Sequence, residues 1–141
     1  MDAHTVYFVN GQKEDFDTII YATGYRVSFP FFDKDFIDYS ALDTIPLYKK
    51  MMHPEWDNLY FIGLFQPQGC IWPLADYQSR IVSLIIKGHL KRPENIKEAI
   101  EKERRKTRKH FKGNVRHALE VDYYSFRKQL LAELRKVKIT T

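Results

Sequence analysis

The pattern of apolar and polar positions predicts a helix between residues 73 and 88. Apolar residues recur there at steps of three and four, which places them on one face of an α-helix. Pro73 is favoured in a first helical turn, and Gly88 is favoured just after a last one. The expected buried face consists of Leu74, Tyr77, Ile81, Leu84 and Ile85.

The last third of the chain predicts two further helices. One runs from Pro93 to about residue 110 and is largely polar, with Glu94 in its first turn, as the helix dipole favours. The other covers residues 122–136, and Asp122 is a suitable N-cap. Its expected buried side consists of Phe126, Leu130, Leu131 and Leu134.

Two apolar runs, residues 18–21 and 59–64, are typical of strands that are covered on both faces. The dipeptide Asn10-Gly11 is a strong hairpin signal. It predicts that a strand over residues 5–9 turns back and pairs with the run 18–21. The chain therefore combines a hairpin and buried strands with C-terminal helices, which indicates an α/β fold.

Two other segments complete this prediction. Residues 27–44 are rich in aromatic side chains and irregular in pattern, so we expect a loop. Residues 47–52 predict a short strand, which ends at His53-Pro54 because a residue before proline is restricted.

Each buried run ends in a sequence that permits a close approach of the backbone to a ligand. The first continues into Ala22-Thr23-Gly24-Tyr25, and the second meets the turn Gln66-Pro67-Gln68-Gly69 directly before the helix. Glycine allows such an approach, and ligands bind at the carboxyl ends of strands in open α/β sheets. Both stretches are therefore candidate binding segments.

In this order, the two stretches resemble the carboxyl-terminal third of flavin-containing monooxygenases. The resemblance rests on the ATGY element, on the GLFQPQG turn followed by Pro73, and on Gln78-Ser79-Arg80. It implies a partial FAD domain of a flavoprotein with two dinucleotide-binding domains. Residues 1–90 then form the C-terminal part of the FAD/NADP-binding Rossmann-type region, and residues 91–141 form a helical extension.

The resemblance also implies FAD and NADP as cofactors. It assigns Thr23, Gly24 and Tyr25 to the junction of the FAD and NADP domains. It assigns the turn residues Gln66, Pro67, Gln68 and Gly69 to flavin contact, where the helix start faces the pyrimidine edge of the ring.

Each of these assignments has a structural alternative. The turn Gln66–Gly69 can be a plain capped turn, and Gly24 can simply allow a tight bend beside a core Tyr25. Arg26 can reach a phosphate or form an exposed salt bridge. Gln78 and Arg80 can cap or pair, and no catalytic residue is assigned.

The dinucleotide fingerprints of the family are absent from this sequence. The six glycines stand at positions 11, 24, 63, 69, 88 and 113, and no two are separated by a single residue, so no GxGxxG exists. The FxGxxxHxxx(Y/F) stretch of the family is missing too. We therefore expect a carboxyl-terminal piece that is inactive alone and is completed by an N-terminal FAD/NADP-binding part.

In the intact family, one oxygen atom of O2 enters a soft nitrogen or sulfur nucleophile, or a ketone, of a small-molecule substrate at the expense of NADPH. A Baeyer–Villiger-type enzyme and a flavin reductase remain open within this class. The alternative outside it is a non-catalytic remnant or interaction module that binds a protein partner.

Composition and charge also bear on disulfides, metal sites, nucleic-acid binding, membrane insertion and cellular location. The single Cys70 excludes an internal disulfide, and the five histidines lack metal-ligand spacing, so no metal site is expected. Residues 102–112 hold seven Lys or Arg, but acidic residues precede them, so we expect a solvated helix face rather than a nucleic-acid site. No apolar run approaches the roughly 20 residues of a transmembrane helix, and the first residues do not resemble a signal peptide. These features predict a cytoplasmic protein.

Overall fold

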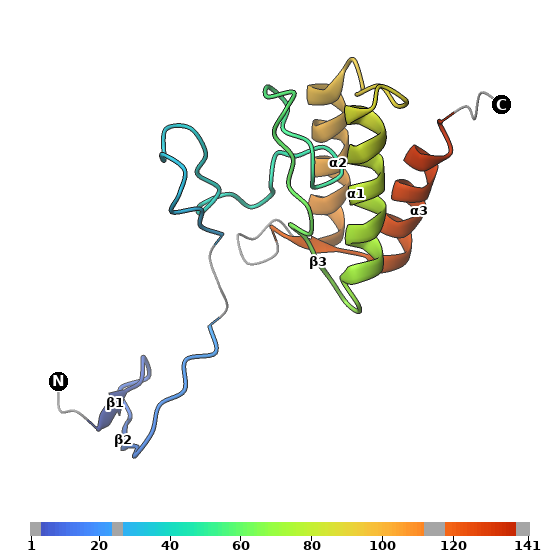
Figure 1. Ribbon diagram of the computed structural model, residues 1–141. Helices are drawn as coiled ribbons and strands as arrows, with labels where there is room; N and C mark the ends of the chain where they lie inside the picture. Colours follow the sequence, from blue (N-terminus) through green and yellow to red (C-terminus); the bar gives the residue numbers. More distant parts are fainter. Residues whose placement is uncertain (1–3, 24–26, 112–117, 138–141) are drawn as a thin grey trace.

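The computed structural model describes residues 4–23, 27–111 and 118–137, which form three helices and four short strands. In Figure 1 the helices lie side by side, and the N-terminal hairpin lies away from them. The elements in chain order are β1 (Thr5–Tyr7), β2 (Lys13–Asp15), β3 (Gln66–Pro67), α1 (Trp72–Ile86), α2 (Ile96–Phe111), β4 (Glu120–Val121) and α3 (Tyr123–Leu134).

The predicted hairpin exists, but its returning strand is not the one expected. β1 pairs antiparallel with β2, with Thr5 opposite Asp15, and Gly11 has a φ of 83° in the turn. The run 18–21 forms no strand, and Ile20 is 85% exposed. A strand buried on both faces needs paired neighbours and covering layers. None of the described residues pairs with residues 18–21, so the prediction of a buried strand is wrong for this structure.

The segment 47–52 is a tight turn, so the predicted strand there is wrong. Lys49 and Lys50 adopt φ angles of 50° and 56°, in the left-handed region that a strand cannot contain. The amide of Tyr48 donates to the carbonyl of Met52 at 3.0 Å and closes the turn. The preceding residues 27–44 form the irregular loop that the sequence predicts.

The second apolar run, residues 59–64, is not a strand either. It contributes only an isolated bridge between Met52 and Tyr60. Gly63 has a φ of 79°, which interrupts the extended conformation. Extended pairing begins after the run, where β3 lies parallel to β4 with Gln66 opposite Glu120.

The helices follow the sequence more closely than the strands do. α1 begins one residue before Pro73, and Gly88 follows its end with a φ of 73°, as predicted. The N-cap of α3 is Asp122, whose carboxylate accepts a hydrogen bond from the amide of Ser125 at 2.8 Å. Both helix predictions are confirmed.

α2 begins at Ile96, three residues after the predicted start at Pro93. Just before this start, the guanidinium of Arg92 donates to the carbonyl of His53 at 2.6 Å and to that of Trp56 at 3.2 Å. These contacts hold the chain before the helix against the loop that begins at His53. The helix then starts at its first buried residue.

The main hydrophobic cluster joins α1, the beginning of α2, α3 and the turn at residues 48–52. Of the predicted face of α1, Leu74 and Ile81 are fully buried, whereas Tyr77, Leu84 and Ile85 are partly buried. A second cluster forms beneath the loop 27–44 and includes Tyr39. The main cluster draws on residues before and after position 90, and the predicted domain boundary there stays a prediction.

Candidate functional site

The turn after β3 is anchored at its beginning by the C-terminal part of the chain. The amide of Gln66 donates to the carbonyl of Leu119 at 2.7 Å, and β3 and β4 form a parallel pair. Figure 1 shows this pair crossing beside the first turns of α1 and α3. The β3–β4 pairing thus fixes the position at which the turn begins, directly before α1.

The turn itself presents its surface to solvent. Gln66, Gln68 and Gly69 are exposed, and Pro67 is half-buried. Gly69 has a φ of 137°, which residues with a side chain rarely adopt. A ligand can therefore approach the backbone between β3 and α1 without meeting side-chain bulk at position 69.

The N-terminus of α1 carries no negative charge of its own. Its N-cap, Ile71, provides no side-chain hydrogen bond, and the first turn contains no acidic residue. α3 differs, because Asp122 caps it. Pro73 has no N–H, and the amides of Leu74 and Ala75 donate to the carbonyl of Ile71, so the start of α1 offers chiefly the positive end of its dipole. This positive end favours an anion or a group that gains electron density. This arrangement fits the pyrimidine edge of a flavin, which gains such density on reduction.

The other candidate stretch is only partly described. Thr23 is exposed, whereas Gly24, Tyr25 and Arg26 lie outside the described residues. In Figure 1 the segment after β2 leads away from the hairpin. No hydrogen bond of the described residues joins Thr23 to the turn 66–69.

Gln78 has a role that the sequence did not identify. Its side chain is fully buried, its Oε1 accepts from the amide of Gly63 at 2.9 Å, and its Nε2 donates to the carbonyl of Lys49 at 2.8 Å. One sequence signal could have revealed this role: Gln78 is a polar residue on the predicted buried face, one helical turn after Leu74. Arg80, by contrast, forms an exposed ion pair with Asp76, in which Nη1 of Arg80 lies 4.0 Å from Oδ2 of Asp76.

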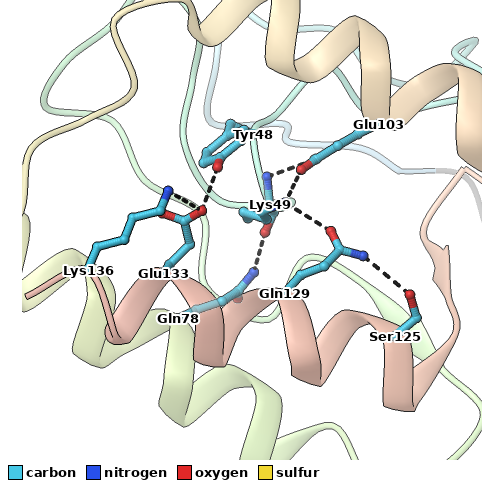
Figure 2. Close-up of polar contacts among 8 residues, drawn as sticks. All are labelled: Tyr48, Lys49, Gln78, Glu103, Ser125, Gln129, Glu133 and Lys136. Carbon is cyan, nitrogen blue, oxygen red and sulfur yellow. Dashed lines mark hydrogen bonds and ion pairs between the residues drawn. The ribbon is translucent and has the colours of Figure 1, made fainter.

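A polar network holds the turn at residues 48–50 to α2 and α3, as Figure 2 shows. The ammonium of Lys49 pairs with Glu103 on α2 and donates to Gln129 on α3 at 2.9 Å. Tyr48 donates to the buried Glu133 at 2.7 Å. Burial, and then the contact with Glu133, raises the pKa of Tyr48 far above its ordinary value. The network is structural, and its partners are too distant in sequence for a local pattern to reveal.

The described residues also bear on whether the chain has a metal site, a membrane-spanning helix or a free basic surface. No cluster of three or more His, Cys, Asp or Glu in the described part of the chain is arranged to hold a metal ion. None of the described helices is long and apolar enough to cross a membrane. In the basic run, Arg104 and Arg105 both pair with Glu101.

Comparison with known proteins identifies the family. The model of the flavin-binding monooxygenase-like family matches residues 1–139. Flavin-containing monooxygenase 5 of Mus musculus is 36% identical over 121 residues, which are 82% of this chain and 22% of that protein. Dimethylaniline monooxygenase [N-oxide-forming] 2 of Cavia porcellus is 31% identical over 126 residues, 86% of this chain and 23% of that protein. The chain belongs to the flavin-binding monooxygenase-like family.

The fold agrees with this assignment. The structure of S-allyl-L-cysteine S-oxygenase from Allium sativum superimposes with a TM-score of 0.70 and 22% sequence identity over 94% of this chain and 31% of that chain. The mixed helix and strand arrangement is thus that of a flavin monooxygenase structure. The chain spans less than a quarter of the length of the mouse and guinea-pig relatives.

Proposed function

We propose that this chain forms the C-terminal part of the FAD site in an FAD- and NADP-dependent monooxygenase with two dinucleotide-binding domains. The observation that carries the proposal is the exposed turn Gln66–Gly69 followed by α1, whose N-terminus has neither a side-chain cap nor an acidic residue. This combination leaves the positive end of the helix dipole available to a flavin.

The residues of this chain bind and orient the cofactor in this proposal. Gln66, Pro67, Gln68 and Gly69 contact the flavin, and Thr23, Gly24 and Tyr25 pack where the FAD and NADP domains meet. When bound, the flavin supplies the redox and oxygen chemistry. The helix end favours the negative charge that develops on the ring.

The proposed reaction transfers one oxygen of O2 to a soft nitrogen or sulfur nucleophile, or to a ketone. The guinea-pig relative is named for N-oxide formation and the garlic protein for S-oxygenation, which supports a soft nucleophile as substrate.

Completion by an N-terminal FAD/NADP-binding part is an element of this proposal. The described residues contain no glycine-rich fingerprint, and Ile19, Ile20 and Tyr21 are exposed apolar side chains that such a part would cover. The chain alone is then inactive, and a cytoplasmic location is proposed with it. The same exposed residues favour a second candidate, a non-catalytic module that binds a protein partner.

Flavin binding tests the proposal. The chain is purified alone and after co-expression with the N-terminal part of the mouse relative, and flavin absorbance is measured before and after addition of NADPH. We expect bound flavin that NADPH bleaches only after co-expression. Co-purification of the two parts without flavin supports the interaction module instead.

A single charge at the turn gives a sharper test. In the co-expressed complex, Gln68→Glu places a carboxylate at the start of α1, and we expect it to lower the flavin reduction potential because it disfavours the reduced ring. Gln12→Glu makes the same change in the distant hairpin and serves as the control. Equal potentials for both variants contradict the contact between the turn and the flavin.

A further inference from the structure

A cavity of about 530 Å³ lies between the segment 44–50, α2, β4 and α3. Its volume is in the range of small-molecule sites. Part of its wall is apolar and includes Leu47, Ile100 and Phe126. None of the described residues of the turn 66–69 or of α1 lines it, so the cavity is separate from the proposed flavin site.

Lys50 lines this cavity and is itself buried, with 8% of its surface exposed. Its Nζ donates to the carbonyl of Ala118 at 2.9 Å. Burial lowers the pKa of Lys50 to about 8, against a smaller opposing effect of Glu103. Its left-handed φ of 56° is unusual for a residue with a side chain. The fold thus holds an ammonium group in a poorly solvated position beside a cavity.

Other charged groups line the cavity from each neighbouring element. They are Glu103, Arg104 and Lys106 on α2, Glu120 in β4, Asp122 at the N-cap, and Lys128 on α3.

The carboxylates among these groups are already engaged. Glu103 pairs with Lys49, Asp122 caps α3, and Glu120 has an interaction of its own. No ion pair joins Lys50 to any carboxylate among the described residues. Glu103 attracts the ammonium of Lys50 only in part, because burial still lowers the pKa of Lys50. A buried charge without a direct ion pair is costly, and an anion in the cavity would offset that cost.

We propose that this cavity is a binding site for a small carboxylate with an apolar body, and that Lys50 is its counter-ion. The carboxylate neutralises the ammonium group, while the hydrocarbon part packs on the wall formed by Leu47, Ile100 and Phe126. The site is independent of the flavin assignment, because it uses neither the turn nor α1.

Isothermal titration of the full chain with octanoate and with 2-naphthoate tests this site. Octanol has a similar apolar body without the charge. At pH 7 we expect at least one of the two carboxylates to bind tenfold or more tightly than octanol. Absence of binding by both carboxylates, or equal binding of octanoate and octanol, overturns the proposal.

Two variants assign the binding to Lys50. Lys50→Met keeps most of the side-chain length but removes the charge, and we expect it to weaken binding of the tighter carboxylate by at least tenfold. Lys87→Met removes one charge from an exposed position after α1, outside the cavity, and should change the affinity by less than twofold. Circular dichroism verifies that both variants keep their helices. Wild-type affinity in Lys50→Met overturns the proposal.

The pH dependence of binding is a second readout, measured on the wild type and compared with Lys50→Met. Above pH 8 the unliganded Lys50 loses its proton, so binding of the anion requires proton uptake. We expect the affinity of the wild type to fall about tenfold or more between pH 7 and pH 10. The other charged groups are common to wild type and Lys50→Met, so the difference between their profiles isolates Lys50. A flat wild-type profile overturns the proposal.

Discussion

Single buried polar side chains decide how the loops of this protein attach to its helices. Gln78 satisfies one amide and one carbonyl that the core would otherwise leave unpaired, and Tyr48 and Lys49 connect one turn to two helices. Tyr39 is different, because its buried hydroxyl has no hydrogen-bond partner among the described residues. Such groups are costly when unpaired, so these positions are sensitive to substitution.

Gln78→Leu should destabilise the chain by about 3 kcal/mol. Leucine fills a similar volume but removes the partner of the part-buried amide of Gly63 and that of the buried carbonyl of Lys49. Ser79→Ala, an exposed change on the same helix, should alter the free energy of unfolding by less than about 0.5 kcal/mol. Urea denaturation measures both, and equal stability of the two variants contradicts the role of Gln78.

Tyr39→Phe should stabilise the chain by about 1 kcal/mol at pH 7, because it removes a buried hydroxyl that has no partner in the described part of the chain. Burial raises the pKa of Tyr39 to about 12, whereas the unfolded value is about 10. The unfolded wild type therefore loses the proton first, and its stability falls as the pH rises from 10 toward 12. The advantage of Tyr39→Phe should grow by about 1 kcal/mol at pH 10.5. Denaturation at both pH values measures it, and a loss of stability at pH 7 contradicts the prediction.

At the level of elements, the two helix starts differ in a way that matches different roles. α3 begins with a carboxylate that accepts a hydrogen bond from the amide of Ser125, whereas α1 begins without one, next to an exposed turn. An intrinsic cap stabilises a helix, and an uncapped start leaves the positive end of its dipole for another group.

Asp122→Ala should cost about 1 kcal/mol of stability, because the amide of Ser125 loses its acceptor. Asp76→Ala removes an exposed carboxylate from α1 and should cost less than about 0.5 kcal/mol. Thermal unfolding followed by circular dichroism compares the two. A larger loss for Asp76→Ala would show that the cap is not what stabilises α3.

The helices could be predicted from the sequence because their signals are local. The spacing of Leu74 and Ile81, Gly88 after α1 and Asp122 before α3 all lie within a few residues of the structure that they specify. The run 18–21 could not be placed in this way, because a strand depends on neighbours elsewhere.

In the candidate site, too, local features could be predicted from the sequence and long-range contacts could not. The turn 66–69 and the helix that follows it could be located, since a glycine and a proline mark them. The partners of Tyr48 and Lys49 lie 85 and 54 residues away, and the cavity beside Lys50 forms only when three segments meet. No short-range pattern contains that information.

On the scale of the whole molecule, apolar exposure concentrates in the first part of the chain. The hairpin and the run after it expose Tyr7, Val9, Ile20 and Tyr21 to a large extent, whereas residues 44–53 and the buried faces of the helices form a core. A large exposed apolar surface marks an interaction site.

The isolated chain should therefore bind a hydrophobic dye such as anilinonaphthalene sulfonate, mainly through residues 5–21. The double variant Ile20→Ser and Tyr21→Ser should reduce dye fluorescence at least twofold. The matched variant Ile86→Ser and Tyr124→Ser removes the same side-chain types from exposed helix positions that are separate from that run. An equal reduction in both double variants contradicts a concentrated surface.

The pairing of β3 with β4 also constrains the order in which parts of the chain can fold during synthesis. Gln66 pairs with Glu120, which leaves the ribosome 54 residues later, or roughly 3 to 10 s at ordinary rates of synthesis. Gln78, in contrast, bonds to residues that are made before it. α1 can thus dock against finished chain as it emerges, while the turn before it waits for the final residues. The main hydrophobic cluster also includes Phe126 and Leu130, so a nascent chain should complete both its core and the turn before α1 only after residues 120–130 have emerged.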